Sequence, residues 1–309
     1  MTISIITNHD NDPTPWIQSL KQVDPSLDIQ VWPDEKNRAD VTFALCWKQP
    51  AGVLKEYPNL KCICSMGAGV DHLFNDPFFP DHLPVIRIID PLLTRSMFEY
   101  ICATALYLIR NIDRYTAQQR QSRWQVHRYA TMKETTIGIM GLGQLGAYAA
   151  ENLFRLGFTV RGWSNTLKHI KGVTTYDADR LEPFLSGTDI LVCLLPLTDQ
   201  TRGLLNRALF DHLPEGAGLI NVGRGGHLVE ADLLAALDTG QLSRACLDVF
   251  ATEPLPVDHP FWRHDRILVT PHCSSITDPD SVAPQVVKNY RLMENGAPLI
   301  NQVDTARGY

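Results

Sequence analysis

The chain has 309 residues, a formal net charge of −6 and seven scattered cysteines. Its length predicts about two domains with a large buried core. The 28 basic residues are dispersed, which argues against a nucleic-acid partner. Residues 1–10 lack the features of a signal peptide, and no run of about 18 apolar residues predicts a membrane span. We therefore expect a cytoplasmic protein that has neither nucleic acid nor a membrane as partner, and no metal.

Strand-like and helix-like segments alternate along the chain, which predicts an α/β fold with parallel sheets. The first series of strands is expected at Ile3–Thr7, Ile29–Trp32, Val41–Trp47, Cys62–Met66 and Val85–Ile89. A helix capped by Ser96 is expected to continue to about Arg120. The second series of strands is expected at Thr136–Met140, Phe158–Trp163, Ile190–Leu195, Gly218–Val222, Ala245–Val249 and Ile267–Val269. A last helix, Ser281–Asn295, is expected to return to the first domain.

A glycine-rich turn joins the strand expected at Thr136–Met140 to the helical segment after it. This strand–turn–helix context predicts a dinucleotide-binding site. Its six residues are Gly141, Leu142, Gly143, Gln144, Leu145 and Gly146. The first glycine permits the tight turn, the second lets a pyrophosphate approach the backbone, and the third lets the helix pack against the strand. The amides and the positive dipole end of that helix would then face the phosphates.

The end of the second strand of this series indicates the choice of cofactor. An NAD site usually places a carboxylate there, to bond the ribose hydroxyls. This chain has Ser164 and Asn165 instead, and Lys168 follows closely. Serine and asparagine can hydrogen-bond a 2′-phosphate, and a lysine can add charge. We therefore expect NADP rather than NAD; the alternative is that Lys168 is an ordinary surface lysine and both cofactors are accepted.

Three polar residues follow three later strands of the same sheet. Arg224 lies between glycines after one strand, Glu253 comes shortly after Asp248 at the end of the next, and His272 follows the last strand. Because ligands of open α/β sheets bind at the carboxyl ends of the strands, we expect these side chains at one edge. An arginine there can hold a carboxylate or a carbonyl oxygen.

The chain resembles the D-isomer-specific 2-hydroxyacid dehydrogenases over essentially its full length. The matching segments are Gly67–Asp71, Gly141–Gly146, Leu195–Thr198, Asn221–Gly225, Asp248–Pro254 and Thr270–His272. Within that family it is most similar to the bacterial glyoxylate/hydroxypyruvate reductases. The segments that carry this closer similarity are Ala44–Trp47, Ser65–Asp71, Met97–Tyr100 and Gln302–Tyr309.

The resemblance implies two doubly wound parallel-sheet domains. A flavodoxin-like substrate domain would comprise residues 1–97 and 277–309, and a Rossmann cofactor domain would comprise residues 98–276. It also adds Leu195, Pro196 and Val222 to the cofactor-binding residues. Asp248 would accept from the nicotinamide amide, although it could be only a structural hydrogen-bonder.

The resemblance also implies a reaction, the NADPH-dependent reduction of small 2-keto acids such as glyoxylate and hydroxypyruvate. Arg224 would polarise the keto group, His272 would protonate the developing alkoxide, and Glu253 would orient the imidazole.

The substrate would be held by residues of the first domain and of the long helix. The backbone amides of Ala68, Gly69 and Val70 would receive its carboxylate. Trp47 and Tyr100 would line the substrate end; either could equally belong to the core.

Two further expectations concern partners and rival functions. The resemblance implies a homodimer in which the segment from Leu106 to Arg128 reaches across to the second subunit. A related enzyme that prefers a bulkier 2-keto acid remains an alternative, as does a non-enzymatic nicotinamide-sensing corepressor, since such regulators can keep the arginine, glutamate and histidine.

Overall fold

The computed structural model describes residues 2–8 and 12–305, and the chain divides into two compact units. The first unit comprises residues 1–93 and 277–309, and the second comprises residues 94–276. The boundary expected after residue 97 falls inside helix α3 (Pro91–Ile109). The functional roles of the two parts stay a prediction. Residues 306–309, which end one of the segments similar to the bacterial reductases, lie outside the described residues.

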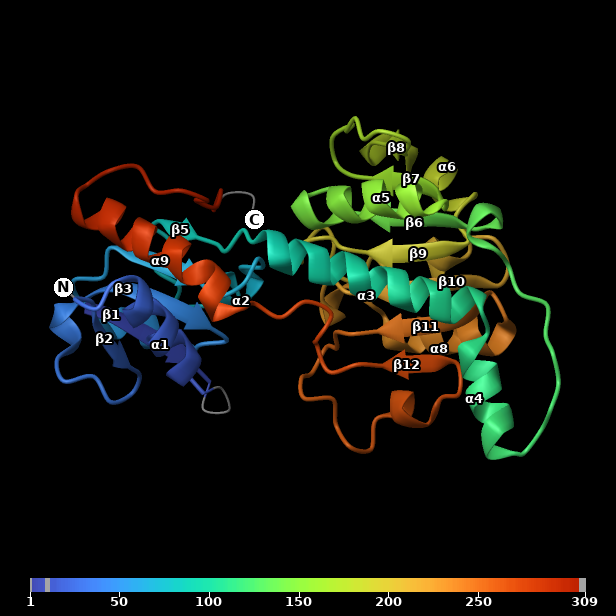
Figure 1. Ribbon diagram of the computed structural model, residues 1–309, viewed down its shortest axis with the longest axis horizontal. Coiled ribbons are helices and arrows are strands. Elements are labelled where there is room, and N and C mark those ends of the chain that lie inside the picture. Colours follow the sequence, from blue (N-terminus) through green and yellow to red (C-terminus); the bar gives the residue numbers. More distant parts are fainter. Residues whose placement is uncertain (1, 9–11, 306–309) are drawn as a thin grey trace. The chain divides into compact units, whose positions relative to one another are not determined.

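The first unit is built around a five-stranded parallel sheet with the strand order β2-β1-β3-β4-β5 (Figure 1). This is the order of flavodoxin-like folds, so the expected fold of this unit is confirmed. The strands are β1 (Thr2–Thr7), β2 (Asp28–Val31), β3 (Val41–Trp47), β4 (Cys62–Ser65) and β5 (Val85–Ile86). Because side chains alternate along a strand, Ile5 enters the core cluster on one face of the sheet and Ile6 the cluster on the other.

Helices cover the sheet of the first unit. They are α1 (Thr14–Val23), α2 (Asp71–Phe74) and α9 (Pro279–Glu294), with short 3-10 turns η1 (Arg38–Asp40) and η2 (Val53–Glu56). The expected return of the last helix is confirmed, because Val286 and Tyr290 of α9 share a buried cluster with Leu20 of α1. This helix begins two residues earlier than expected, since the side chain of Asp278 caps it by accepting from the backbone amide of Asp280.

The second unit contains a seven-stranded parallel sheet with the order β12-β11-β10-β9-β6-β7-β8. From β6 onward this is the Rossmann strand order, which confirms the expected fold. The strands are β6 (Thr136–Met140), β7 (Thr159–Trp163), β8 (Thr174–Tyr176), β9 (Ile190–Cys193), β10 (Ala217–Asn221), β11 (Leu242–Leu247) and β12 (Ile267–Val269). Only β8 was not expected from the sequence, because this three-residue edge strand has no buried residue.

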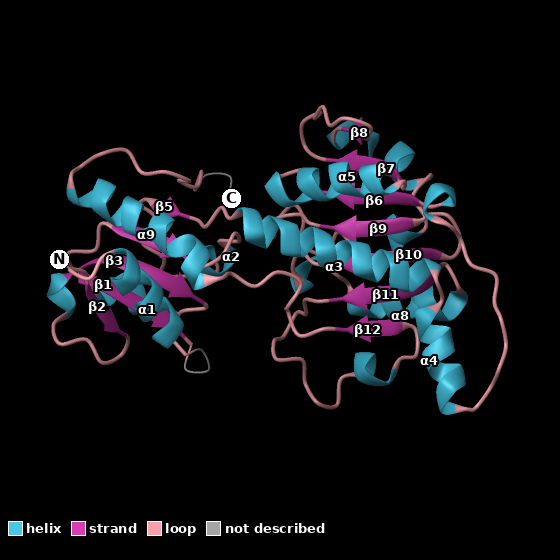
Figure 2. Cartoon of the chain, in the orientation of Figure 1, coloured by secondary structure: helices cyan, strands magenta, loops and turns pink. Residues whose placement is uncertain are grey.

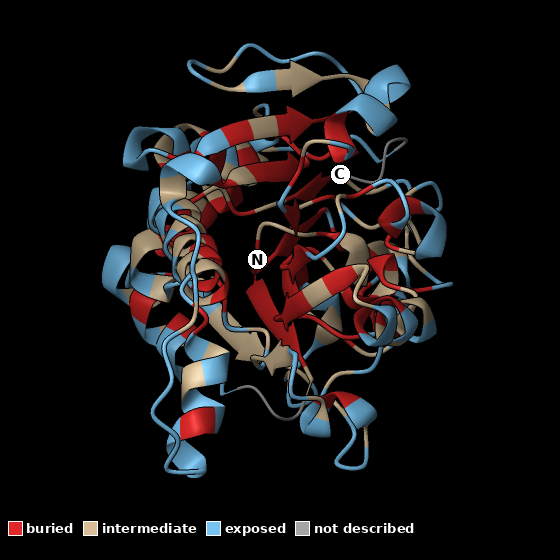
Figure 3. Cartoon of the chain, turned by 90° about the vertical axis from the view of Figure 1, so that its right-hand side faces the viewer, coloured by how far each residue is buried: buried red, intermediate tan, exposed pale blue. Residues whose placement is uncertain are grey.

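Helices lie on both faces of this second sheet (Figure 2). Its helical elements besides α3 are α4 (Ile112–Arg120), α5 (Gln144–Leu156), α6 (Leu181–Leu185), α7 (Arg207–Phe210), α8 (Glu230–Thr239), η3 (Met132–Glu134), η4 (Ala178–Arg180), η5 (Gly225–His227) and η6 (Pro260–Arg263). Buried side chains of α3 and α5 share one core cluster, and those of α6, α7 and α8 share the other. Figure 3 shows the consequence: the central strands are buried, and much of the outer helical surface is exposed.

The helix expected from Ser96 to about Arg120 is two helices with an earlier start, so that prediction is wrong in two respects. α3 begins at Pro91, because the carboxylate of Asp90 accepts from the amides two and three residues later. Proline suits the first position of a helix, where its missing N–H costs nothing. The helix breaks at Asn111, whose positive φ of 54° is incompatible with a continuous α-helix.

Helix α3 also corrects the expectation that no segment could span a membrane. It is long and apolar enough by length and composition, and it is the single helix of that kind in the described part of the chain. However, Met97, Ile101 and Ala105 of this helix are buried in the core of the second unit. A core helix passes the same test, so composition does not identify α3 as a membrane span.

Candidate functional site

The turn between β6 and α5 has the geometry that its glycines predict. Gly141 adopts a φ of +103°, which a side chain would disfavour. A Cβ on Gly146 would lie 1.8 Å from the carbonyl oxygen of Gly141, so helix and turn approach too closely for any other residue. A Cβ on Gly143 would have no described atom within 4 Å. The side of the turn where a pyrophosphate is expected is therefore open.

The N-terminus of α5 fits a bound phosphate. Gly143 is its N-cap and supplies no side chain, and the first described intrahelical bond runs from Ala147 to the Gly143 carbonyl. Consequently the amides of Gln144, Leu145 and Gly146 have no acceptor within residues 2–8 and 12–305. Unpaired amides at a positive helix end form an anion site. These residues could thus hold the pyrophosphate of a dinucleotide.

The loop after β7 carries the residues expected to choose between NADP and NAD. The hydroxyl of Ser164 donates to the carbonyl of Thr166 at 2.8 Å, which curls the loop. The carbonyl of Lys168 accepts from the hydroxyl of Thr175 at 2.6 Å. Asn165 and the lysine are exposed, and residues 164–173 contain no carboxylate. The loop is therefore suited to an anionic group.

The remaining cofactor residues follow β9 and β10. Leu195 and Val222 are buried, whereas Pro196 is exposed and its carbonyl accepts from the hydroxyl of Thr201 at 2.7 Å. All three come after the carboxyl ends of parallel strands, which is the same edge of the sheet as the glycine turn.

Arg224 lies on the turn after β10, and buried polar groups hold its backbone. The side chain of Asn221, which is fully buried, donates to the Arg224 carbonyl at 3.1 Å and accepts from the amide of Gly223. The guanidinium Nη1 donates to the Gly223 carbonyl at 2.7 Å. Arg224 is half-buried. A guanidinium carries five N–H donors in a planar fork, which is a geometry that can bind an oxyanion.

His272 and Glu253 form a hydrogen-bonded pair after β12 and β11. The Nδ1 of the imidazole lies 2.8 Å from the Oε2 of the carboxylate, and the Oε1 accepts from the amide of Phe250 at 3.0 Å. The two side chains are 25% and 19% exposed, so the pair is neither sealed in the core nor fully solvated. His272 has a positive φ of 51°, a strained conformation of the kind found at functional sites.

Asp248 fixes the loop that carries this histidine. Its carboxylate is fully buried and accepts from the Thr270 hydroxyl at 2.6 Å and from the amides of Cys273 and Ser274 at 2.9 and 2.8 Å. Its carbonyl also accepts from the amide of His272. These bonds favour the structural alternative for Asp248 over a contact with nicotinamide, which stays a prediction.

Tyr100 belongs to the same network. Thr270 has a single hydroxyl proton, which it donates to Asp248, so the Tyr100 hydroxyl is the donor in the 2.6 Å bond to Thr270. Burial raises the pKa of Tyr100, which keeps the phenol protonated as this bond requires. The hydroxyl proton of Tyr100 is therefore used in a hydrogen bond within the second unit. A contact between Tyr100 and the substrate stays a prediction.

In the first unit, Trp47 is the last residue of β3, and the loop at Gly67–Val70 follows the carboxyl end of β4. The hydroxyl of Ser65 donates to the Gly69 carbonyl at 2.7 Å and accepts from the amide of Gly67. A Cβ on Gly67 would lie 2.8 Å from the indole of Trp47, so ring and loop touch. Among the described residues nothing accepts from the amides of positions 68, 69 and 70. Such a loop can bind an anion.

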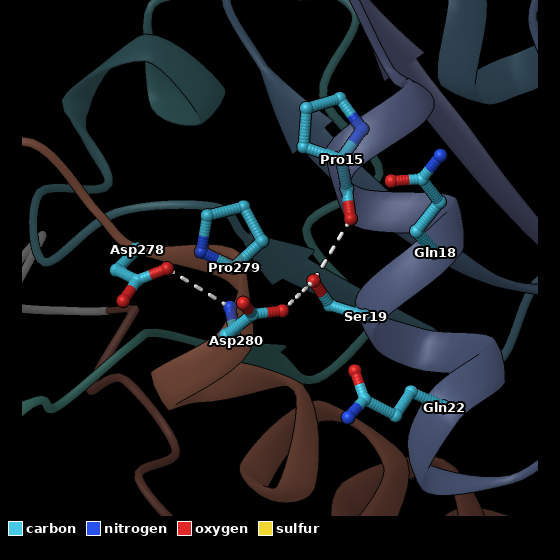
Figure 4. A pocket seen from close by; sticks show the side chains of 7 residues that line it. All are labelled: Pro15, Gln18, Ser19, Gln22, Asp278, Pro279 and Asp280. Atoms are coloured by element: carbon cyan, nitrogen blue, oxygen red, sulfur yellow. Dashed lines mark hydrogen bonds between the residues drawn. The ribbon is translucent and has the colours of Figure 1, made fainter.

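A polar pocket of the first unit lies elsewhere, between the start of α9 and α1 (Figure 4). The hydroxyl of Ser19 lies within donating distance of two acceptors, the carbonyl of Pro15 and the carboxylate of Asp280. The bond to Asp280 joins α1 to α9, and none of the expected site residues lines this pocket. Across the described ranges there is also no cluster of three histidine, cysteine or acidic side chains that could hold a metal ion.

Sequence reasoning did not single out Ser65, Asn221, Thr270 or His227, all of which hold expected site residues in place. Their signal is weak because Ser65, Asn221 and His227 bond backbone groups of loops, and Thr270 bonds side chains that are distant in the sequence. Ser65, Asn221 and Thr270 each begin one of the segments that carry the family resemblance, and His227 lies three residues after Arg224.

A model of the D-isomer specific 2-hydroxyacid dehydrogenase NAD-binding domain matches residues 102–274. Glyoxylate/hydroxypyruvate reductase A of Yersinia enterocolitica is 42% identical over 303 residues, which are 95% of this chain and 96% of that protein. The chain belongs to the D-isomer-specific 2-hydroxyacid dehydrogenase family. The same reductase of Serratia proteamaculans is 40% identical over 95% of this chain and 96% of its own length.

Solved structures agree with this membership. A D-isomer specific 2-hydroxyacid dehydrogenase from Xanthobacter autotrophicus, in complex with NADPH and MES, has a TM-score of 0.93 and 42% identity, with 100% of this chain and 99% of that chain covered. An NADPH-dependent glyoxylate/hydroxypyruvate reductase from Sinorhizobium meliloti, in complex with NADP and sulfate, has a TM-score of 0.93, 36% identity and the same coverage.

Proposed function

We propose that this protein reduces small 2-keto acids, glyoxylate and hydroxypyruvate, to 2-hydroxy acids with NADPH. The observation that carries the proposal is the 2.8 Å bond between His272 and Glu253, which follow β12 and β11, while Arg224 follows the neighbouring strand β10 at the same edge of the sheet. Similarity to proteins named glyoxylate/hydroxypyruvate reductase A supports the substrate class. Residues 98–276 would bind the cofactor, and residues 1–97 with 277–309 would bind the substrate.

NADPH, when bound, would supply the hydride that adds to the keto carbon. His272 would act as the general acid: its Nδ1 is hydrogen-bonded to Glu253, so the opposite ring nitrogen, Nε2, would give a proton to the keto oxygen. The carboxylate would orient the ring and stabilise its protonated form. Arg224 would hold and polarise the oxygen as negative charge develops on it.

The substrate carboxylate would bind the amides of Ala68, Gly69 and Val70, whose lack of an acceptor within the described chain supports this role. Trp47 beside this loop would line the substrate end, and Tyr100 would do so from α3. Asp248 could in addition contact the nicotinamide amide.

The cofactor preference would be set after β7. Ser164 and Asn165 stand where a carboxylate would repel a 2′-phosphate, and Lys168 adds positive charge. Gln144 and Leu145, with Gly141, Gly143 and Gly146, would cradle the pyrophosphate, while Leu195, Pro196 and Val222 would line the rest of the cofactor site. The NADP and NADPH ligands of the solved relatives support this preference.

The proposed assembly is a homodimer through the segment from Leu106 to Arg128. Trp124 and Val126 of this segment are 98% and 81% exposed, which is unusual for large apolar side chains. Arg244 ties the base of the segment to the sheet through bonds to Asp113 and Asn111. A Trp124→Asp variant should halve the mass measured by light scattering, whereas an unchanged mass would remove the segment from the interface.

We also propose a cytoplasmic location, without nucleic-acid or membrane partners. The seven cysteines are all described and none forms a disulfide, as expected in a reducing compartment.

The proposed enzymatic function is tested by NADPH oxidation in the presence of glyoxylate or hydroxypyruvate. Saturable oxidation of NADPH supports it, and cofactor binding without turnover of any 2-keto acid would contradict it.

A further inference from the structure

We propose that His227 is a positioning residue that holds Arg224 with one ring nitrogen and the Pro196 loop with the other. This inference rests on the proposed function, because it concerns the arginine and the cofactor loop of that same site. The histidine itself touches neither substrate nor cofactor in the proposal.

The ring of His227 lies between two loops that follow neighbouring strands. It ends the short turn η5, and its side chain is fully buried. The Nδ1 lies 3.0 Å from the backbone amide of Arg224, and the Nε2 lies 3.2 Å from the carbonyl of Pro196. Pro196 follows β9 and Arg224 follows β10, which pair directly in the sheet.

The two distances assign the tautomer. In the neutral ring with a proton on Nε2, Nδ1 accepts from the Arg224 amide and Nε2 donates to the Pro196 carbonyl, so both bonds form together. A proton on Nδ1 would point to the Arg224 carbonyl, also 3.0 Å away, and would leave the Arg224 amide facing a second donor. Of the two neutral tautomers, the Nε2–H form is the one that satisfies the Arg224 amide and the Pro196 carbonyl together.

The consequence for Arg224 is a backbone fixed from two sides. Its amide donates to His227, and its carbonyl accepts from the side chain of Asn221 at 3.1 Å. Both partners are fully buried, so water cannot replace them without a cost. The direction in which the guanidinium leaves the chain thus depends on the imidazole.

The consequence for Pro196 is different. Its carbonyl also accepts from the hydroxyl of Thr201 at 2.7 Å, so it keeps a partner if the imidazole is lost. The bond from His227 adds a link between the cofactor loop and the turn that carries Arg224. A ring that merely filled space would need neither nitrogen, which gives the proposal a direct test.

Two conservative substitutions separate the nitrogens. In His227→Asn, the amide oxygen takes the place of Nδ1 and can still accept from Arg224, while the link to Pro196 is lost. In His227→Gln, the amide nitrogen takes the place of Nε2 and can still donate to Pro196, while the acceptor for Arg224 is lost. His212→Gln, at an exposed histidine of the same unit, is the matched control.

We expect His227→Gln to raise the KM for glyoxylate about 10-fold at an unchanged Kd for NADPH, and His227→Asn to keep the KM and weaken NADPH severalfold. The KM, the Kd from NADPH fluorescence and the melting temperature would be measured for each variant. Equal effects of the two variants on both constants, or none, would overturn the proposal.

The tautomer can be tested without turnover. Nitrogen-15 NMR of histidine-labelled protein, with the resonance assigned by its loss in His227→Gln, should show a neutral Nε2–H ring; a neutral Nδ1–H ring would overturn the assignment. If the unmodified enzyme reduces no 2-keto acid, the proposed function fails. The His227 inference would then be judged by this spectrum and by NADPH binding alone.

Discussion

The Nδ1 of His272 lies 2.8 Å from the Oε2 of Glu253, although 18 residues separate them along the chain. The other carboxylate oxygen accepts a hydrogen bond from the backbone amide of Phe250. This bond holds the Glu253 side chain in place independently of the imidazole. A fixed carboxylate restricts the imidazole to one orientation and one tautomer, which is what a general acid requires. The geometry of this pair supports the proton transfer that we propose for His272.

Replacing His272, the proposed general acid, should remove catalysis and leave the binding of NADPH intact. His272→Gln should lower kcat by about 100-fold or more, the usual contribution of a positioned acid. NADPH affinity should be unchanged, because the glycine turn and the β7 loop are untouched. Stopped-flow turnover and fluorescence titration would measure the two effects, and normal turnover would remove the role proposed for His272.

Glu253 should act only through His272. Glu253→Gln should lower kcat roughly 10-fold or more, with little change in the affinity for NADPH. In a His272→Gln background the same substitution should cost almost nothing more, since its partner is gone. Additive losses in this double-mutant cycle would show that Glu253 works on the substrate independently.

Alanine substitutions at Gly146 and Gly143, two glycines of the turn between β6 and α5, should have different effects on stability and on cofactor binding. Gly146→Ala would force a Cβ against the Gly141 carbonyl, so we expect a loss of about 1–3 kcal/mol in the free energy of unfolding. Gly143→Ala meets no described protein atom and should fold normally, yet bind NADPH more weakly because its Cβ enters the phosphate space. Denaturation and cofactor titration of both variants make the comparison, and tight NADPH binding by Gly143→Ala would place the phosphates elsewhere.

Lys168 should discriminate between the two cofactors. Lys168→Ala should weaken NADPH and leave NADH nearly unchanged, because only NADPH carries the 2′-phosphate. Lys133→Ala is a suitable control, since Lys133 is exposed in the turn before β6. An equal loss for both cofactors would show that Lys168 serves another purpose.

Much of the fold could be predicted because its central strands are apolar runs that lie between two layers of helices. The edge strand β8 lacked such a run, so Thr174–Tyr176 gave no signal. The start of α3 was misplaced because Ser96 resembles a cap, whereas the carboxylate of Asp90 is the one that bonds the first amides. Local patterns cannot choose between two plausible caps, since tertiary contacts decide which one is used.

For the candidate site, the sequence predicts which residues follow the strands but not the hydrogen bonds that support them. The positions of Arg224, Glu253 and His272 after the carboxyl ends of strands could be predicted because each lies in a recognisable motif. The supporting bonds could not, because Asp248 reaches Ser274 and His227 reaches Pro196 only after the loops have folded. A side chain that hydrogen-bonds a backbone group far away in the sequence produces no periodic pattern by which it could be recognised.

The most direct test of the account is the initial rate of NADPH and NADH oxidation with glyoxylate, hydroxypyruvate and phenylpyruvate. We predict rapid, saturable turnover of the two small acids with NADPH, and weaker turnover with NADH. Turnover of phenylpyruvate alone would move the substrate to the bulkier class. Tight NADPH binding with no turnover of any acid would contradict the account and favour a cofactor-sensing regulator.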